Sequence, residues 1–232
     1  MRALIEFMNT RFFNRLLVSF TSSSFSKLFI PLYRWIYDID MSEVCEDQKF
    51  SSLKDFFIRK IDMNKRPISS DKFISPCDGV ITSAGELSKD KTFLVKGHEV
   101  DVKALLNRDI IASTYQVIYL SPKDYHRFHA IDDNHFIDSY TIGSTSYPVN
   151  DWGLKNAKPF IDNYRHIKET DEYYYIAVGA VNVNSIDFTK DIFKQGDEIG
   201  YFSFGSTIVI IYKNYNGPLK TGSIKVRESL IN

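Results

Sequence analysis

The hydrophobic pattern of residues 1–37 predicts two amphipathic helices at the start of the chain. Leucine, isoleucine and aromatic residues recur there, and they spread around more of a helix than one core-facing stripe requires. The run Ser22-Ser23-Ser24 should separate the two helices, because serine is common at helix ends and Ser24 can act as an N-cap. Pro31 should kink or shorten the second helix, because proline has no backbone N–H to donate.

The pattern changes after the N-terminal segment, and from Phe73 onward it is mostly that of β-strands. Short helices are predicted at 52–61, with Ser52 as N-cap, and at 102–107, with Asp101 in that position. Residues 151–170 are expected to form a loop with one short helix at most. The predicted strands are 80–84, 92–95, 114–120, 135–142, 173–178, 180–186, 199–204 and 207–212.

The stretch around Gly205-Ser206-Thr207 combines the most apolar predicted strand with a candidate nucleophile. Ile208 to Tyr212 is a continuous apolar run, which is typical of a strand buried on both faces. Tyr201 to Phe204 is expected to form the neighbouring strand, so that the Gly-Ser-Thr sequence becomes the turn between them. Gly205 permits backbone torsions that could expose its carbonyl to the Ser206 hydroxyl.

Length and composition indicate one domain with a sizeable core and give no sign of nucleic-acid binding. The 232 residues are 44% hydrophobic, and 29 basic residues balance 29 acidic ones, which leaves no net charge for a basic face. The expected fold class is α+β: a β-rich single domain of barrel-like or sandwich-like antiparallel sheets at 63–232, preceded by a helical region at 1–62. Cys45 and Cys77 lack a metal-ligand spacing, so free thiols or one disulfide are the alternatives.

The N-terminal region is basic as well as aromatic, which suits a membrane surface. Residues 1–37 carry five basic side chains and a single acid, Glu6. Such helices bind anionic lipid, although a helical hairpin docked on the core would give a similar pattern. The chain has no uncharged apolar run of about 18 residues, so no transmembrane helix is expected, and a cleaved secretory signal is not expected either.

Four short stretches together resemble the phosphatidylserine decarboxylase proenzymes in order and spacing. The resemblance extends from the N-terminal helices to about Tyr212, and its strings are specific mainly in combination. They are Ser75-Pro76-Cys77-Asp78-Gly79, then Leu120-Ser121-Pro122-Lys123-Asp124-Tyr125-His126-Arg127-Phe128-His129, then Tyr147-Pro148-Val149-Asn150, and finally Phe204-Gly205-Ser206-Thr207.

The resemblance implies that the chain cleaves itself between Gly205 and Ser206, giving fragments 1–205 and 206–232. Ser206 would be the nucleophile, His129 the base that takes its proton, and Asp78 the group that holds the imidazole in the right tautomer. Attack on the Gly205 carbonyl would give an ester. Loss of the Ser206 α-proton would then part the chain and convert residue 206, through dehydroalanine, to a pyruvoyl group.

The pyruvoyl group would be the covalent cofactor for decarboxylation. It would form a Schiff base with the amine of phosphatidylserine and accept the electrons left by CO2, so that phosphatidylethanolamine is the product. His126 is expected to serve this step as the acid that reprotonates the carbon, and no metal is expected. The implied partners are the phospholipid substrate, the membrane surface and the chain's own fragment 206–232. The implied location is peripheral, on the cytoplasmic face of the cell membrane, and a homodimer is left open.

One departure from the family pattern bears on head-group specificity, and other functions remain as alternatives. Val183-Asn184-Ser185-Ile186 stands where these enzymes usually have glycine in place of Asn184. The alternatives are a pyruvoyl decarboxylase of another amino-acid head group, a serine hydrolase, and a non-catalytic lipid-binding β-module. Ser206 lacks the Gly-x-Ser-x-Gly elbow of many hydrolases and precedes a strand, which disfavours the second.

Overall fold

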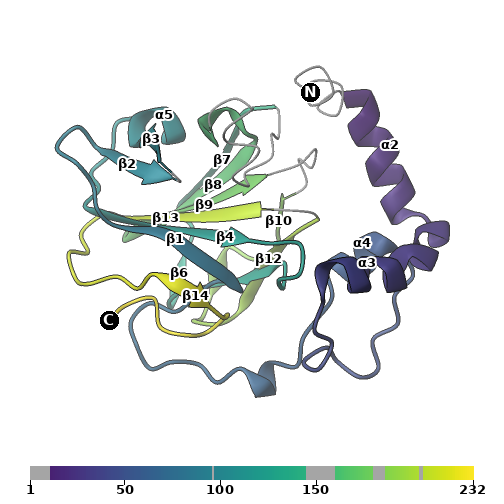
Figure 1. Cartoon of the computed structure of the whole chain (residues 1–232). Coiled ribbons are helices and arrows are strands. Elements are labelled where there is room, and N and C mark those ends of the chain that lie inside the picture. Colours follow the sequence, from purple (N-terminus) through teal and green to yellow (C-terminus); the bar gives the residue numbers. More distant parts are fainter. Residues whose placement is uncertain (1–10, 96, 145–159, 180–185, 204–205) are drawn as a thin grey trace.

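Antiparallel strands dominate the computed structural model, which describes residues 11–95, 97–144, 160–179, 186–203 and 206–232. The largest sheet has seven strands in the order β14-β1-β4-β13-β9-β8-β7, with β13 at its centre (Figure 1). Its strands are β1 (Gly79–Glu86), β4 (Thr114–Leu120), β7 (Asp138–Ile142), β8 (Arg165–Glu169), β9 (Tyr173–Gly179), β13 (Ser206–Tyr212) and β14 (Gly222–Ile224). The expected β-rich α+β class is confirmed.

Three smaller sheets and one short helix complete the β-rich part. A three-stranded sheet has the order β10-β12-β5, and two pairs join β11 to β6 and β2 to β3. Helix α5 (Val102–Leu106) follows β3, and Asp101 caps it as predicted by accepting a hydrogen bond from Lys103 N. The strands are β2 (Thr92–Val95), β3 (His98–Asp101), β5 (Arg127–His129), β6 (Asn134–His135), β10 (Ile186–Phe188), β11 (Ile192–Phe193) and β12 (Glu198–Phe202).

Strand β13 is buried on both faces, as its continuous apolar run predicts. Ile208 and Ile210 belong to the cluster that packs against Phe128 and Phe202 of the three-stranded sheet. Val209 and Ile211 belong to the cluster on the other face, which includes side chains of β2, β3 and α5. Because alternate residues of a strand point to opposite faces, one strand contributes to both clusters. Residues 206–232 therefore start with the central strand of the seven-stranded sheet.

The expectation that Tyr201 to Phe204 pairs beside β13 is wrong. Strand β12 lies in the three-stranded sheet, where it pairs with β10 and β5, whereas β13 pairs with β4 and β9. Phe202 is fully buried and packs on Phe128, with ring centroids 5.0 Å apart. Burial of the aromatic residues of β12 between the two layers accounts for the difference. The Gly-Ser-Thr sequence consequently joins two sheets and does not close a hairpin.

The expected loop at 151–170 is also partly wrong. Its described part holds a 3-10 turn, η3 (Phe160–Asp162), and strand β8, which pairs with β7 on one side and β9 on the other. Residues 151–159 lie outside the described ranges. So do Tyr147-Pro148-Val149-Asn150, Gly205 and all of the predicted strand 180–186 except Ile186.

The N-terminal helices lie to one side of the sheets (Figure 1). They are α2 (Arg11–Ser22), η1 (Ser24–Phe29), α3 (Ile30–Tyr37), α4 (Leu53–Phe57) and η2 (Met63–Lys65). The predicted break at Ser22-Ser23-Ser24 is confirmed, but Ser24 is not the N-cap, because it is the first residue of η1 and Ser23 holds the cap position without a side-chain bond. Pro31 lies in the first turn of α3, where its missing N–H costs little. Ser52 caps α4 as predicted, but this helix ends at Phe57 and not at residue 61. None of the helices within the described ranges is long and apolar enough to cross a membrane.

Candidate active site

One edge of the seven-stranded sheet gathers the residues that the sequence singles out. Strand β13 begins at Ser206, which is paired with Leu120 at the end of β4 and with Gly179 at the end of β9. On the other side of β4, strand β1 begins directly after Asp78. The loop 121–126, which leaves β4 at this same edge, carries the first histidine. The topology thus brings Asp78, Ser206 and the histidine loop to one end of the fold.

The histidine loop, residues 121–126, is fixed by hydrogen bonds at both ends. The Asp124 carboxylate accepts hydrogen bonds from the backbone N–H and the hydroxyl of Ser121, both at 2.7 Å, which closes a tight turn. The backbone N–H of Phe202 donates to the His126 carbonyl at 2.9 Å. His126 consequently lies beside the segment that leads from β12 to Ser206. His129, at the end of β5, pairs with Glu198 at the start of β12.

His126 is buried and has one ring nitrogen without a partner. Its Nδ1 lies 2.8 Å from the Asp124 carbonyl, and its ring packs on Phe57 with centroids 4.0 Å apart. Its Nε2 is buried and makes no hydrogen bond. Burial is the main cause that lowers the pKa of His126 to about 3, so the imidazole is neutral at physiological pH. A carbonyl only accepts, so Nδ1 carries the hydrogen and Nε2 keeps a free lone pair.

His129 has a similar tautomer but a different contact on its second nitrogen. Its Nδ1 lies 3.0 Å from the Gly196 carbonyl, and its Nε2 lies 3.1 Å from the Tyr125 hydroxyl. Because the carbonyl requires a hydrogen on Nδ1, the Tyr125 hydroxyl donates to the Nε2 lone pair. Burial is again the main cause that lowers the pKa of His129, here to about 4. The nitrogen able to take a proton is therefore Nε2, at present covered by Tyr125.

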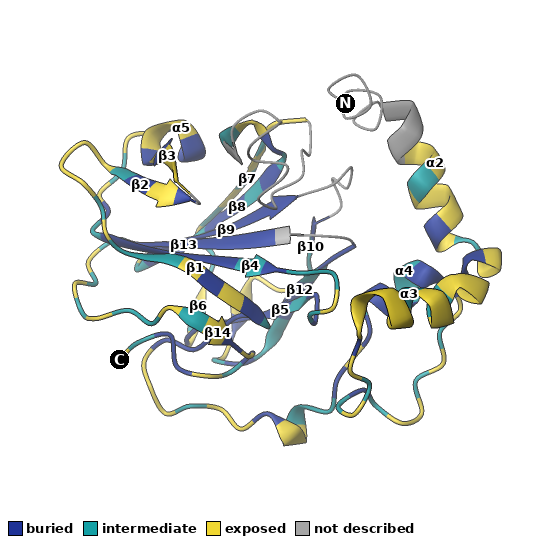
Figure 2. Cartoon of the chain, viewed as in Figure 1, coloured by how far each residue is buried: buried dark blue, intermediate teal, exposed yellow. Residues whose placement is uncertain are grey.

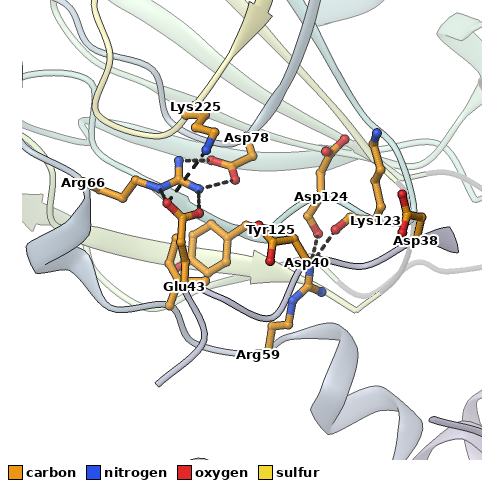
Figure 3. Close-up of a pocket in the computed structure, with 11 residues that line it drawn as sticks. Asp38, Asp40, Glu43, Arg59, Arg66, Asp78, Lys123, Asp124, Tyr125 and Lys225 are labelled. Atoms are coloured by element: carbon orange, nitrogen blue, oxygen red, sulfur yellow. Dashed lines mark hydrogen bonds and ion pairs between the residues drawn. The ribbon is translucent and has the colours of Figure 1, made fainter. Parts of the chain in front are cut away.

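Asp78 is held by groups other than His129. Its two oxygens bind the Arg66 guanidinium at 3.0 and 2.9 Å (Figure 3). One of these oxygens also accepts from Val226 N at 2.8 Å. Burial raises the pKa of Asp78, and the bond and charge of Arg66 oppose that rise. Both ring nitrogens of His129 are bonded to Gly196 and Tyr125, so the expected Asp78–His129 hydrogen bond is not the one formed here. The orienting role of Asp78 stays a prediction.

Two buried polar atoms lack hydrogen-bond partners, one in the stretch that leads from β12 to Ser206 and one in the loop that bonds to Phe202 at the start of that stretch. They are His126 Nε2 and the hydroxyl of Ser203, a residue that is 2% exposed. Buried polar atoms are normally hydrogen-bonded, so two such atoms on these segments suit a site where a polar group forms. The chain therefore fits a pyruvoyl group derived from Ser206. Within the described ranges, no set of three or more His, Cys, Asp or Glu side chains could hold a metal ion.

A pocket of about 210 Å³ opens between the N-terminal segment and the histidine loop (Figure 3). The Arg66 guanidinium lies between the carboxylates of Glu43 and Asp78, and Arg59 reaches the main chain of the histidine loop. The pocket is lined by Asp38, Asp40, Glu43, Arg59, Ile61, Arg66, Asp78, Lys123, Asp124, Tyr125 and Lys225.

Several partners of the predicted residues carry no strong signal in the sequence. Tyr125 could have been suspected from its place inside the histidine string. Arg66 and Gly196 could not have been suspected, because both lie outside the strings that contain Asp78 and His129. Gly196 contributes only its main-chain carbonyl, which any residue at that position would supply. The structure thus surrounds Asp78 and His129 with contacts that the strings alone do not indicate.

Comparison with known proteins identifies the family. A family model described as phosphatidylserine decarboxylase matches residues 53–230. The phosphatidylserine decarboxylase proenzyme of Anoxybacillus flavithermus is 38% identical over 224 residues, which cover 90% of this chain and 84% of that protein. The proenzyme of Bacillus cereus strain ATCC 10987 is 35% identical over 227 residues, or 91% of this chain and 87% of that protein. The chain therefore belongs to the phosphatidylserine decarboxylase family.

Proposed function

We propose that this chain is a self-processing phosphatidylserine decarboxylase that releases CO2 and phosphatidylethanolamine. The observation that carries the proposal is the single sheet edge at which Ser206, Asp78 and the histidine loop meet. A neutral, buried imidazole lies beside that edge with a free nitrogen, as proton transfer requires.

Processing begins with Ser206 and His129. His129 receives the Ser206 hydroxyl proton on Nε2 while Oγ bonds to the Gly205 carbonyl carbon; the Gly205–Ser206 C–N bond then breaks, and the released nitrogen takes the proton. Removal of the Ser206 α-proton expels the Gly205 carboxylate and leaves dehydroalanine. Hydrolysis then releases ammonia and leaves the pyruvoyl group at position 206. Asp78, whose charge Arg66 stabilises, supports this step.

Decarboxylation needs a group that moves a proton in an otherwise buried site, and His126 suits that work. The pyruvoyl group supplies a sink for the electron pair left when the substrate carboxylate departs as CO2. Because His126 is neutral, it first receives a proton from the substrate ammonium on Nε2. It then returns that proton to the carbon that has lost CO2. Packing on Phe57 keeps the ring in place between the two transfers.

The substrate is a membrane lipid, and the N-terminal helices supply a surface for reaching it. Large apolar side chains on η1 and α3 face outward: Trp35 is 80% exposed, Leu28 67% and Phe25 62% (Figure 2). Lys27 and Arg34 lie on the same two helices and Arg15 on the preceding helix α2, which suits an anionic surface. We infer peripheral attachment to the cytoplasmic face of the membrane, where anionic lipid gives basic helices a favourable surface.

The mass of the purified protein tests the processing step. Two chains should be found, 1–205 and 206–232, the smaller with a pyruvoyl group in place of an N-terminal serine. Vesicles that contain phosphatidylserine should release CO2 on addition of the protein. Lipids with another amino-acid head group, assayed in parallel, test the alternative substrate class. An active protein with an intact, unmodified Ser206 would overturn the proposal, and so would a cleaved protein that releases no CO2 from any of these lipids.

A further inference from the structure

The two histidines share an arrangement that involves two arginines, Arg59, which is buried, and Arg227, which is half-buried. The Asp124 carbonyl, 2.8 Å from His126 Nδ1, also accepts from Arg59 Nη2 at 3.1 Å. The Gly196 carbonyl, 3.0 Å from His129 Nδ1, also accepts from Arg227 Nη2 at 3.3 Å. Each imidazole thus shares its main-chain acceptor with the guanidinium of a different arginine.

Sharing an acceptor with a guanidinium fixes the tautomer of each imidazole and keeps the ring neutral. An arginine is always protonated in proteins and can only donate, so it holds the carbonyl in place as an acceptor. The imidazole must then present an N–H to that carbonyl, which leaves the lone pair on Nε2. The nearby positive charge also disfavours a second proton on the ring. It adds to burial, the larger cause, in lowering the pKa of both histidines.

Arg59 occupies a position that is costly to maintain. It is 3% exposed, and its Nε and Nη1 are buried without hydrogen-bond partners. The bonds of its Nη2 go to the carbonyls of Lys123 and Asp124 in the histidine loop, at 2.6 and 3.1 Å. A buried guanidinium with unpaired nitrogens lowers the stability of a fold. The cost is explained if Arg59 serves to hold the histidine loop in position.

Arg227 is in a costly position for a different reason. Its backbone has φ of +73°, in the left-handed region that a long side chain rarely occupies. Its guanidinium binds three main-chain carbonyls, with Nη1 on Met63 and Arg66 and Nη2 on Gly196. A hypothetical Cβ on Gly196 would lie 3.3 Å from Arg227 Nε, so the two residues are in close contact. The strained backbone is thus coupled to a side chain that supports the acceptor of His129.

We propose that Arg59 and Arg227 are positioning residues, one for each histidine, that keep His126 and His129 in the tautomer with the lone pair on Nε2. The tautomers are a property of the fold, but their use in processing and decarboxylation rests on the proposed function. Arg59 precedes the sheets in the chain, whereas Arg227 belongs to fragment 206–232. Residues 213–232, the tail that follows β13, must therefore dock before His129 is oriented. The fold is then complete before the chain is cut.

Two substitutions separate the side-chain role from general damage to the fold. Arg227→Gly removes the guanidinium and also relieves the left-handed backbone, since glycine adopts that conformation freely. Arg59→Met removes the donors but keeps an apolar stem of similar length. Arg59→Lys and Arg227→Lys keep a donor and should retain part of the tautomer preference of His126 and His129. Arg108→Gln is the matched control, because Arg108 pairs with Asp138 and Glu169, away from both histidines.

Nitrogen NMR of the histidine rings gives the decisive readout. It is measured on full-length protein that carries Ser206→Ala, which remains one chain. We expect both rings as the Nδ1–H tautomer, a change confined to His129 with Arg227→Gly, and a change confined to His126 with Arg59→Met. Arg108→Gln should change neither ring. Unchanged tautomers in the two test variants, or a change in the histidine that the arginine does not serve, would overturn the proposal.

Activity then connects the tautomers to the two chemical steps. With Ser206 present, Arg227→Gly should slow cleavage at least tenfold, and Arg59→Met should cleave normally but lower kcat at least tenfold with little change in KM. Normal rates of both steps in the two variants would overturn the positioning role. If the unsubstituted protein neither cleaves nor decarboxylates, the proposed function fails, and the NMR result still decides whether the arginines set the tautomers.

Discussion

Each of the two histidines is a neutral base in a buried setting, yet they differ in one contact. His126 Nε2 has no partner, whereas His129 Nε2 accepts the Tyr125 hydroxyl. A site that must take a proton from Ser206 and later deliver one to a substrate carbon needs proton carriers at two positions. The contrast between the two Nε2 atoms suits separate roles.

We predict that the two roles can be separated by mutation. His129→Ala and Asp78→Asn should leave the chain uncleaved or slow its cleavage by about 10²- to 10⁴-fold, the range for loss of a general base. His126→Ala should still cleave but release CO2 poorly. The measurement is a denaturing gel beside a CO2-release assay, with His135→Ala as control because His135 is exposed on β6. If His126→Ala blocks cleavage as fully as His129→Ala, both imidazoles belong to processing.

The low pKa values of the histidines also predict acid sensitivity of the fold. An unfolded histidine titrates near 6.5, whereas His129 and His126 in the fold titrate at about 4 and about 3. Between these values the unfolded chain binds more protons than the folded one. The stability that neutrality contributes is therefore complete above pH 6.5 and is lost as pH falls toward the folded pKa values.

Urea unfolding of the Ser206→Ala protein between pH 7.5 and 4.5 measures this effect. Near pH 5.3, each histidine should contribute a slope of about 1.4 kcal/mol per pH unit to the free energy of unfolding. His129→Gln and His126→Gln should each remove about one such increment. Slopes that are the same in these two variants and in the unsubstituted background would contradict the assignment of buried, neutral histidines.

The residue types at the site could be read from the sequence, but their contacts could not. Asp78, His126 and Ser206 stand in strings specific enough to name. The acceptor of His129 is a main-chain carbonyl, which every residue possesses, and the arginine that supports it lies in the tail. Only the folded topology brings these groups together.

At the scale of elements, local signals succeeded where capping or uniform burial sets the structure. Ser52 and Asp101 cap helices as predicted, and β13 is buried as its apolar run indicates. Strand β8 was missed because Arg165 and Lys168 are buried in it, which breaks the usual alternation. Arg165 satisfies its guanidinium on main-chain carbonyls, and Lys168 pairs with Asp191. Such polar strands need partners that only the tertiary structure supplies.

The helices α2, η1 and α3 lead to a prediction about membrane binding. None of the eight residues of α3 is buried, and apolar side chains there meet solvent (Figure 2). The protein should float with vesicles that contain anionic lipid, and Trp35→Ser together with Leu28→Ser should lower the vesicle-binding constant on the order of 10²- to 10³-fold, because burial of each side chain contributes on the order of 2 kcal/mol. Ile192→Ser, at an exposed apolar position on β11, is the matched control.

Salt separates the two contributions to this binding. High salt should weaken flotation without abolishing it, because charge attraction is screened while apolar burial persists. Equal flotation of the double variant and the unsubstituted protein would assign α3 to a role other than membrane contact. Flotation that does not depend on anionic lipid would remove the role of the basic residues.

At the scale of the whole molecule, cleavage at Ser206 would cut the chain at the start of its central strand. Strand β13 pairs along its full length with β4 and β9, from Ser206 to Tyr212. The tail after it returns to the site, where Val226 N binds Asp78 and Arg227 binds the carbonyls of Met63, Arg66 and Gly196. The smaller fragment thus contributes the middle of the core as well as part of the site.

We therefore predict that fragments 1–205 and 206–232 remain associated after cleavage without a covalent link. Removal of β13 would expose five buried residues, Ile208 to Tyr212, and each contributes on the order of 2 kcal/mol through its burial. Size-exclusion chromatography of the cleaved protein should give one peak that contains both fragments, and they should part only in denaturant, in the same transition that unfolds the sheet. Uncleaved Ser206→Ala is the control. A smaller fragment that elutes separately under native conditions would mean that β13 is not held by the core, and it would leave Asp78 and His129 without the contacts that the tail supplies.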